Sequence, residues 1–380
     1  MRGHSVAVCN PAPAPARLIA EAGLENPPLP ELPARPSAAV SRIWDVDCLF
    51  ANIGFGDEVF ARAMTEIYID LIRAQNPDVL IDAFNPFACL AARIRGKPLV
   101  TVTQGDFHPK SRGFIWWEGE LPNDLPSAAP VFSRIAGEHG LSAVKRVIDL
   151  FSGDLDLLVG TPETDPLPPL ATATYVGPIV AGSPDDSLPD WVSELEPDRP
   201  LIWLYPGNPR YGAGPGVADS IVVIRTALSA LANRRMHVVM TMGHQTLPVE
   251  FGRLPDNFRL ADYLPGLAMA ARSDLMIHHG GHSSYMTGAL MGTPQIIVPT
   301  LSERESNARH MFALGCGEIV IPTVDAEGEK HVDAAEFGAK VEAVLAEPRY
   351  REAARRLAAT TRRFGGAREA ADRIERLAAI

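Results

Sequence analysis

The chain has 380 residues, of which 46% are hydrophobic and 21% charged, and its formal net charge at pH 7 is −11. This composition excludes a globally disordered protein, and at about 150 residues per domain the length predicts two domains. The acidic balance argues against broad binding to a nucleic-acid backbone, and no apolar run approaches the roughly 20 residues that span a bilayer. The first residues lack the apolar stretch of a secretory signal, and the four cysteines form no CxxC pair. Buried free thiols in a reducing compartment explain them, so we expect a cytoplasmic protein.

Short apolar runs recur along the chain, and most are continuously apolar, which is typical of strands buried on both faces of a parallel sheet. They cover residues 6–8, 79–81, 99–102, 155–159, 201–204, 237–240, 275–277, 296–298 and 319–321. Helical patterns cover residues 57–75, 217–233, 283–291 and 334–346. The alternation of strands and helices predicts an α/β fold.

A Pro-rich stretch without hydrophobic periodicity covers residues 161–199 and is typical of loops and linkers. We therefore place an N-terminal domain at residues 1–180, a linker at 181–198 and a C-terminal domain at 199–350. The remaining residues, 351–380, are expected to form helices that cross back to the N-terminal domain.

Residues 273–299 are the most informative segment, because they combine a strand, a Gly-Gly turn, a short helix and a second strand. Gly280 and Gly281 allow a tight turn and the close approach of a ligand, and Ser283 and Ser284 are good N-cap residues. A helix that begins at the carboxyl end of a parallel strand presents N–H groups that commonly bind phosphate. The segment therefore predicts an anion site.

Three histidines in the same segment, His278, His279 and His282, leave two other interpretations open. A metal site is disfavoured, because neighbouring residues on a strand point to opposite faces and no cysteine or carboxylate lies within a few positions. The other interpretation is a purely structural glycine turn with incidental histidines.

The segment resembles the donor-binding loop of the UDP-glycosyltransferase-like enzymes of the bacterial natural-product and macrolide type, in which a strand ends in His-Gly-Gly. The resemblance implies the GT-B fold, with two Rossmann-like domains that face each other across a cleft. It also implies that the diphosphate of a nucleotide sugar is held by His279, Gly280, Gly281, Ser283 and Ser284.

Other stretches extend the resemblance to the rest of the donor site. Residues 262–265 resemble the segment whose aromatic ring stacks on the nucleobase, which implies this role for Tyr263 and its neighbour Leu264. Residues 199–208 resemble the first strand and loop of the donor domain, which implies a donor-binding role for Asn208 at their end.

Glu303 and Arg304 stand where the family has an Asp-Gln pair that holds the sugar hydroxyls. Glu303 can still accept hydrogen bonds, whereas Arg304 cannot accept any and adds a positive charge. Arg304 therefore suits a carboxylated or otherwise unusual sugar, or it turns to the diphosphate.

The resemblance assigns Asp82, at the end of an acceptor-domain strand, as the acid that partners the catalytic histidine; a helix N-cap or turn residue is the alternative interpretation. The family's first strand, loop and helix, which supply that general base, have no counterpart here, and His4 does not replace it. Loss of a general base typically costs about 10²–10⁴ in rate. We expect Met1 to be an internal methionine of a longer protein, and a degenerate relative that binds without catalysis is the alternative.

Two further sites are expected in the N-terminal domain. His108 is a candidate substitute base that faces the cleft, against the alternative of a solvent-exposed loop histidine. Trp116 and Trp117 are candidates for the lining of an apolar acceptor pocket, against the alternative of ordinary core residues.

The resemblance implies inverting transfer of a sugar, from a UDP- or dTDP-linked donor to a hydroxyl of a small apolar acceptor, with no cofactor and no metal. Two alternatives stay open: a nucleotide-sugar-binding or helper protein without transfer activity, and a sugar-nucleotide epimerase on the same fold. The expected partners are the two substrates, with no nucleic acid and no integral membrane segment, and a homodimer is left open.

Overall fold

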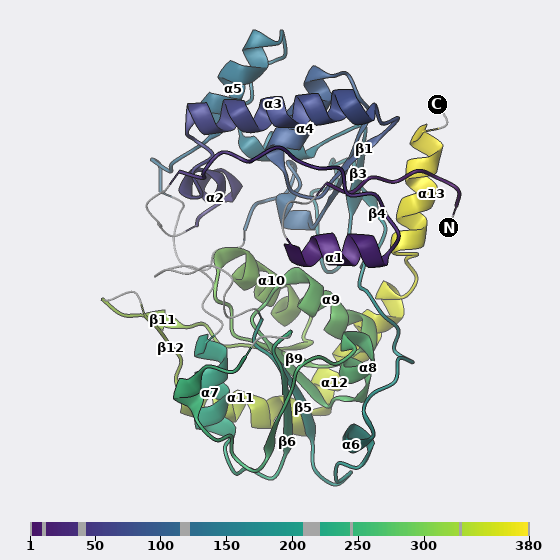
Figure 1. Ribbon diagram of the computed structural model, residues 1–380. Helices are drawn as coiled ribbons and strands as arrows, with labels where there is room; N and C mark the ends of the chain where they lie inside the picture. The colour runs from purple at the N-terminus through teal and green to yellow at the C-terminus, as the bar shows by residue number, and fades with distance from the viewer. Residues whose placement is uncertain are drawn as a thin grey trace.

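The computed structural model of the protein describes residues 2–9, 13–36, 43–114, 122–207, 221–243, 246–326 and 329–378. Two parallel sheets, each covered by helices, divide the chain into two α/β halves that lie one above the other in Figure 1. We call them the N-terminal half, built on β1 to β4, and the C-terminal half, built on β5 to β10. The predicted α/β fold class is confirmed.

The sheet of the N-terminal half has the order β1-β2-β3-β4, and all of its strand pairs are parallel. Its strands are β1 (Leu80–Asp82), β2 (Leu99–Thr103), β3 (Leu155–Leu158) and β4 (Thr174–Tyr175). Its helices are α2 (Val46–Asn52), α3 (Glu58–Gln75), α4 (Pro86–Ile94), α5 (Ala129–Glu138), η1 (Gly105–Phe107) and η2 (Val147–Phe151). Because the strands are parallel, their carboxyl ends share one edge of the sheet, and the loops that leave this edge carry the polar residues discussed below.

Local signals explain where the helices of this half begin and end. The side chain of Asp57 accepts a hydrogen bond from Phe60 N and caps the start of α3. Asn76, at the end of α3, adopts a left-handed conformation with φ of 43°. The side chain of Asn85 caps α4 in the same way as Asp57 caps α3. Phenylalanine rings pack against one another in the core, with Phe55, from the loop before α3, and Phe87 of α4 4.6 Å apart between ring centroids.

The sheet of the C-terminal half has the order β10-β9-β8-β5-β6-β7, with parallel pairing throughout. Its strands are β5 (Leu201–Tyr205), β6 (His237–Thr241), β7 (Phe258–Ala261), β8 (Leu275–His278), β9 (Gln295–Ile297) and β10 (Gly317–Ile319). The chain leaves β5 toward β6 on one side and later returns to β8 on the other side. The strand order therefore reverses between β5 and β8, and in open α/β sheets ligands bind at the carboxyl ends of the strands at such a point.

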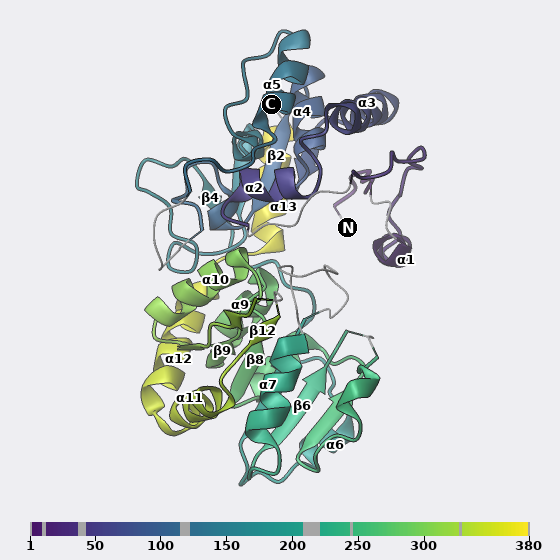
Figure 2. The ribbon, with the colours of Figure 1, turned by 90° about the vertical axis from the view of Figure 1, so that its left-hand side faces the viewer.

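Helices cover both faces of this sheet. Among them, α9 and α10 lie at the top of the C-terminal half, on the side that faces the N-terminal half (Figures 1 and 2). The helices are α6 (Asp190–Ser193), η3 (Val249–Phe251), α7 (Ile221–Leu231), α8 (Gly266–Arg272), α9 (His282–Met291), α10 (Ser302–Ala313), α11 (Ala334–Ala346) and α12 (Pro348–Thr361). A short antiparallel hairpin joins β11 (Thr323–Val324) and β12 (Lys330–His331). Within the described parts of the chain, no helix is long and apolar enough to cross a membrane.

The last helix, α13 (Ala367–Ala378), lies against the N-terminal half, whereas α12 lies beside the C-terminal half (Figure 1). Ala370 packs with Val100, Leu157 and Val176 of the N-terminal sheet, and Ile374 adds to the same cluster. The C-terminal segment thus passes from one half to the other.

The strand predicted at residues 6–8 is wrong. Ala7 forms only an isolated bridge with Glu25, outside both sheets. The preceding residues are held by charge instead, since Arg2 donates hydrogen bonds from its guanidinium to Glu375 and to a second carboxylate of α13. An apolar run of three residues does not make a strand unless a strand edge is placed to pair with it.

Candidate functional site

A cavity of about 210 Å³ lies at the carboxyl ends of β5 and β8, where the strand order reverses. Aromatic, aliphatic and hydroxyl side chains share its lining, as in many small-molecule sites. They include Trp203, Tyr205, Tyr263, Leu264, Ser283 and Ser284. Four of the residues predicted to bind the donor, Tyr263, Leu264, Ser283 and Ser284, are therefore brought together here.

The β8–α9 loop (residues 279–281) leads into the helix whose Ser283 and Ser284 line this cavity, and His278 at the end of β8 fixes the shape of the loop. Gly280 N donates a hydrogen bond to His278 Nδ1 at 3.1 Å, and His278 Nε2 lies 2.8 Å from Gln295 Oε1. Burial lowers the pKa of His278 to about 4, although Gln295 acts in the opposite direction. His278 is thus neutral at pH 7, with its proton on Nε2, where it donates to Gln295.

Gly280 is the turning point of the loop, with φ of +93°. A Cβ atom at this position would lie 2.7 Å from the backbone oxygen of Arg304 and 2.9 Å from Ile297 Cγ2. The first turn of α10 and the β8–α9 loop therefore touch backbone to backbone, and only glycine fits between them.

His279 points from the same loop toward β5 and is buried, with 8% of its surface exposed. Its ring lies between Gly207 and Gly281, whose added Cβ atoms would come within 2.8 Å and 2.7 Å of its nitrogens. Burial, followed by the charge of Arg304, lowers the pKa of His279 well below its usual value. Among the described residues its buried Nδ1 atom has no hydrogen-bond partner, which marks it as a group that a ligand would satisfy.

Helix α9 starts one residue earlier than predicted. Its first residue is His282, and Gly281 is the N-cap, so the prediction of Ser283 or Ser284 as N-cap is wrong. Because glycine has no side chain to cap the helix, the first N–H groups of α9 are left for another acceptor. Such groups, together with the helix dipole, form a binding site for an anion.

Helix α10 fastens the loop from the side. Asn307 Nδ2 donates to Gly280 O at 2.9 Å and to Glu303 Oε1 at 2.7 Å. Arg304 is buried and donates to Thr300 Oγ1. Its charge lowers the pKa of His279, so the guanidinium acts on the β8–α9 loop.

Asp82 lies in the N-terminal half at the end of β1, and it is buried. Its carboxylate accepts hydrogen bonds from Asn85 N at 2.8 Å and from Cys89 Sγ at 3.3 Å, and burial raises its pKa to about 6. None of the described histidines lies within ion-pair distance of this carboxylate. In this structure Asp82 shapes the turn before α4.

His108 follows β2 and is only 1% exposed, so the alternative of a solvent-exposed histidine is wrong. Its Nδ1 accepts a hydrogen bond from Lys110 N at 3.1 Å, and its Nε2 lies 3.4 Å from Asp156 Oδ2. Because Nδ1 accepts from Lys110 and the buried Nε2 faces Asp156 inside the N-terminal half, His108 does not present a base to a substrate in this structure. The other predicted residues of the site, Asn208, Trp116 and Trp117, lie outside the described residues.

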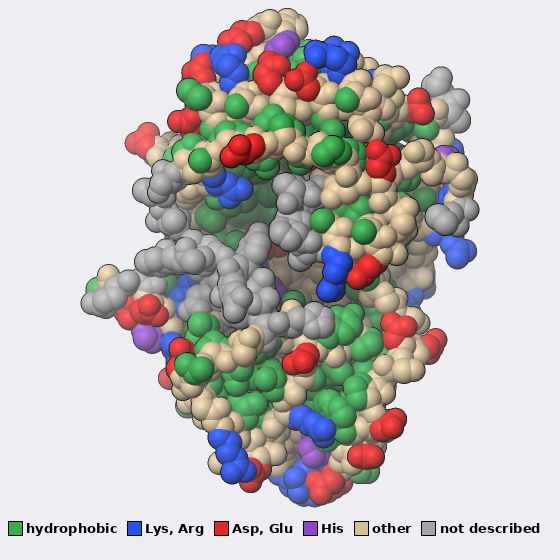
Figure 3. Space-filling view, viewed as in Figure 1, with side chains coloured by type: hydrophobic (Ala, Val, Ile, Leu, Met, Phe, Trp, Pro, Cys, Tyr) green, Lys and Arg blue, Asp and Glu red, His purple; other side chains and the backbone are tan. Residues whose placement is uncertain are grey.

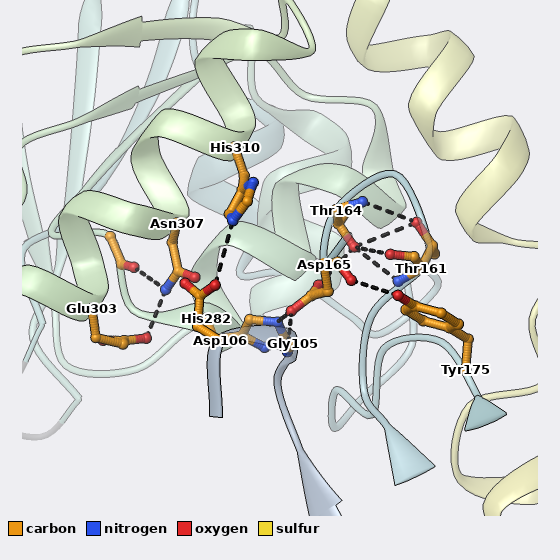
Figure 4. A network of polar contacts seen from close by, with 11 residues as sticks. Gly105, Asp106, Thr161, Thr164, Asp165, Tyr175, His282, Glu303, Asn307 and His310 are labelled. Carbon is orange, nitrogen blue, oxygen red and sulfur yellow. Dashed lines mark hydrogen bonds and ion pairs between the residues drawn. The ribbon is translucent and has the colours of Figure 1, made fainter. Parts of the chain in front are cut away.

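Sequence reasoning missed the polar network between the two halves, which Figure 4 shows. His282 Nε2 lies 3.0 Å and 3.3 Å from the two carboxylate oxygens of Asp165, and His310 Nε2 lies 3.6 Å from Asp106 Oδ1. Both acids follow the carboxyl ends of buried strands, Asp106 in η1 after β2 and Asp165 in the loop after β3. This position in the sequence is the signal that could have marked them as site residues. Within the described ranges, no group of three or more histidines, cysteines or carboxylates is arranged to hold a metal ion.

The neutral state of buried His278 predicts a loss of stability in acid. In the unfolded chain a histidine takes up a proton near pH 6.5, whereas folded His278 does so near pH 4. The free energy of unfolding should therefore fall as the pH drops from 6.5 toward 4, by about 3 kcal/mol for this group. Urea titrations at pH 7 and pH 5 should show a smaller loss for His278→Asn than for the wild type. His139→Gln, altered at an exposed position, should keep the wild-type loss, and equal losses in all three proteins would contradict this role of His278.

Comparisons with known proteins come from both sequence and structure. The family described as Erythromycin biosynthesis protein CIII-like, C-terminal domain, matches residues 225–377. A PGL/p-HBAD biosynthesis glycosyltransferase from Mycobacterium tuberculosis (strain ATCC 25177 / H37Ra) is 31% identical over 310 residues, which cover 74% of this chain and 66% of that protein. A demethyllactenocin mycarosyltransferase from Streptomyces fradiae is 29% identical over 203 residues, 53% of this chain and 40% of that protein. The chain thus spans less than two thirds of the length of either relative.

Solved structures share the arrangement of two halves. CalG4, the calicheamicin glycosyltransferase, superposes with a TM-score of 0.71 at 20% identity, over 98% of this chain and 91% of that one. Glycosyltransferase VinC, solved in complex with dTDP, gives a TM-score of 0.65 at 21% identity, over 99% of this chain and 92% of that one. At these identities the solved structures establish the fold, and the evidence on the family comes from the sequence relatives. The chain therefore has the GT-B fold, and its sequence is similar to those of bacterial natural-product glycosyltransferases.

Proposed function

We propose that this protein transfers a sugar from a nucleoside diphosphate, UDP- or dTDP-linked, to a hydroxyl group of a small apolar acceptor. The observation that carries the proposal is the uncapped start of α9 beside buried His279, at the point where the strand order reverses. Two N-terminal features of one helix, its free N–H groups and its dipole, favour a diphosphate there. The names of the sequence relatives, which are glycosyltransferases, support the same reading.

The cavity suggests how the donor would lie. Tyr263, 61% exposed at the rim, would stack on the nucleobase, and the hydroxyl groups of Ser283 and Ser284 would face the diphosphate. Arg304 already acts on His279, which supports the assignment of its charge to the diphosphate rather than to a sugar carboxylate. Glu303, at the start of α10, would then accept hydrogen bonds from the sugar hydroxyls.

The acceptor would bind to the N-terminal half. Phe84 and Phe107, on the loops that follow β1 and β2, are partly buried and stack 4.3 Å apart. Figure 3 shows a hollow between the two halves with hydrophobic side chains on its upper wall. Aromatic rings at this edge support an apolar acceptor. Trp116 and Trp117 remain proposals for the same pocket.

In the proposed reaction the acceptor oxygen attacks the anomeric carbon from the face opposite the diphosphate. A bond forms between them, the bond from carbon to the phosphate oxygen breaks, and the acceptor proton passes to a histidine base, the partner that the family resemblance gives to Asp82 and that none of the described histidines provides. The configuration of the anomeric carbon inverts. The leaving diphosphate is stabilised by the α9 N–H groups, His279 and Arg304, with no metal ion required.

A second candidate is nucleotide-sugar binding without transfer. Two observations favour it: no described histidine lies beside Asp82, and His108 is buried inside the N-terminal half.

The test combines calorimetry with an activity assay. UDP and dTDP are titrated into the protein, and UDP- and dTDP-sugars are then incubated with a panel of phenols and hydroxylated polyketides, with products detected by mass spectrometry. The proposal expects binding of one nucleotide and a glycoside that forms only when an acceptor is present. Binding without any glycoside would favour the second candidate, and the absence of binding by either nucleotide would contradict both.

A further inference from the structure

Asp165 sits in a site that is built around its carboxylate. Oδ1 accepts a hydrogen bond from Gly105 N at 2.8 Å, and Oδ2 accepts one from Thr164 Oγ1 at 2.8 Å. A Cβ atom on Gly105 would lie 2.8 Å from Asp165 Cβ, and one on Gly160 would overlap Oδ2. Two glycines and a threonine therefore hold this buried side chain in one position at the edge of the N-terminal half (Figure 4).

The fixed carboxylate reaches His282 in the other half of the molecule. His282 Nε2 lies 3.0 Å from Oδ1 and 3.3 Å from Oδ2. Burial acts to raise the pKa of Asp165, but the charge and hydrogen bond of His282 hold it below its usual value. Burial likewise acts to lower the pKa of His282, and Asp165 raises it above its usual value. The contact is therefore a buried ion pair rather than a neutral one.

The acidic groups around His282 favour its charged form, against the effect of burial. Asp106 and Glu303, from η1 and α10, add smaller effects in the same direction as Asp165. From its own helix, the Tyr285 ring stands edge-on at 6.4 Å, and burial raises the pKa of that hydroxyl, so it carries no charge.

The position of His282 in the chain connects the ion pair to the candidate site. It is the first residue of α9, directly after Gly281, and the next two residues line the cavity. We propose that Asp165 is a positioning residue for the nucleotide: by holding His282 across the two halves, it fixes the start of α9 in the arrangement that binds a diphosphate. The inference rests on the proposed function. It also implies that the affinity for the nucleotide depends on the contact between the two halves.

A second pair offers a matched control. His310 Nε2 lies 3.6 Å from Asp106 Oδ1, so this pair also joins a histidine of the C-terminal half to an aspartate of the N-terminal half. His310 is in the last turn of α10, away from the start of α9. Loss of this contact removes a link between the halves without touching the β8–α9 loop.

The experiment titrates UDP or dTDP, whichever the wild type binds, into the wild type, Asp165→Asn and His310→Gln between pH 5.5 and 8. Asparagine carries no charge; its amide oxygen can still accept from Gly105 N, and its NH2 group then faces Thr164 Oγ1 as a donor. At pH 7 we expect about tenfold weaker binding for Asp165→Asn, or about 1.4 kcal/mol, because the charge-assisted hydrogen bond that holds His282 is lost. Binding by His310→Gln should stay within about twofold of the wild type, or about 0.4 kcal/mol.

The pH profile separates positioning from a merely structural role. Without Asp165 the pKa of His282 falls. As the pH is raised, the Asp165→Asn variant should therefore lose its affinity for the nucleotide earlier, at a lower pH, than the wild type does. The difference in nucleotide affinity between Asp165→Asn and the wild type should become smaller at pH 5.5, where His282 is again protonated. The titration of the nucleotide itself is common to all three proteins and cancels in the comparison at each pH.

Each outcome decides between the alternatives. Equal affinities of Asp165→Asn and the wild type would overturn the inference, and so would equal losses in the two variants. If Asp165→Asn does not fold, as judged by its melting curve, His282→Gln replaces it, because glutamine keeps a donor for Asp165 without the charge. Wild-type affinity in folded His282→Gln would again overturn the inference. A wild type that binds neither nucleotide would contradict the proposed function itself.

Discussion

Replacement of Gly280 by Ala is expected to weaken binding of the nucleoside diphosphate by about 100-fold, the equivalent of about 2.7 kcal/mol. The backbone at Gly280 has φ of +93°, and the added Cβ would lie 2.7 Å from the backbone oxygen of Arg304. A backbone atom cannot rotate away, so the β8–α9 loop or the first turn of α10 has to move. Any such movement turns the N–H groups of the loop away from the phosphate oxygens, and charge-assisted hydrogen bonds depend strongly on geometry. Calorimetric titration measures the loss.

Gly140→Ala is the matched control for this substitution. Gly140 also has a positive φ, +74°, but nothing lies within 4 Å of an added Cβ, and it follows α5 in the other half. The two variants share a backbone strain of about 1 kcal/mol or more, and only Gly280→Ala adds the collision. Wild-type affinity in Gly280→Ala, or an equal loss in Gly140→Ala, would contradict the role of the loop.

Replacement of His279 by Ala is expected to weaken nucleotide binding at least tenfold, or by about 1.4 kcal/mol. The ring is buried between two glycines, and its Nδ1 atom has no hydrogen-bond partner among the described residues. A diphosphate oxygen would supply that partner. His237→Gln is the control, because His237 lies at the start of β6, the opposite end of the sheet. Unchanged affinity in His279→Ala would refute the assignment of the β8–α9 loop to the diphosphate.

The same histidine predicts a pH dependence for binding. Burial and the charge of Arg304 lower the pKa of His279, so it is neutral at pH 7 in the free protein. A bound diphosphate places negative charge beside the ring and raises its pKa, so binding takes up a proton. Heats of binding measured in two buffers of different ionisation enthalpy should show this uptake increasing from pH 7 to pH 5.5. The His279→Ala variant should show a smaller uptake.

The sequence predicted the sheets well where strands are buried on both faces. Continuous apolar runs mark β5 and β8, and the Gly-Gly turn after β8 stands where the structure places the loop. Strand β7 was missed, because Arg259 interrupts it on an exposed face at the edge of the sheet. Helix α10 was missed for a related reason: it buries Arg304 and Asn307 through polar contacts, so no apolar stripe reveals it.

The cross-half network could not be read from the sequence, because it depends on contacts between distant residues. Asp165 and His282 are 117 positions apart, and nothing in the local pattern of either residue names the other. His282 entered the sequence analysis as a metal-site candidate, whereas the structure pairs it with a carboxylate. The start of α9 was also predicted imperfectly: Ser283 and Ser284 are good N-cap residues, but the structure has Gly281 as the N-cap.

The most direct test of the central claim is a crystal structure of the protein with bound UDP or dTDP. The account predicts that the diphosphate lies at the start of α9, with phosphate oxygens within hydrogen-bond distance of the N–H groups of the β8–α9 loop and of His279. It also predicts that the nucleobase lies in the cavity beside Tyr263. A nucleotide bound elsewhere, or a diphosphate turned away from the start of α9, would contradict the account.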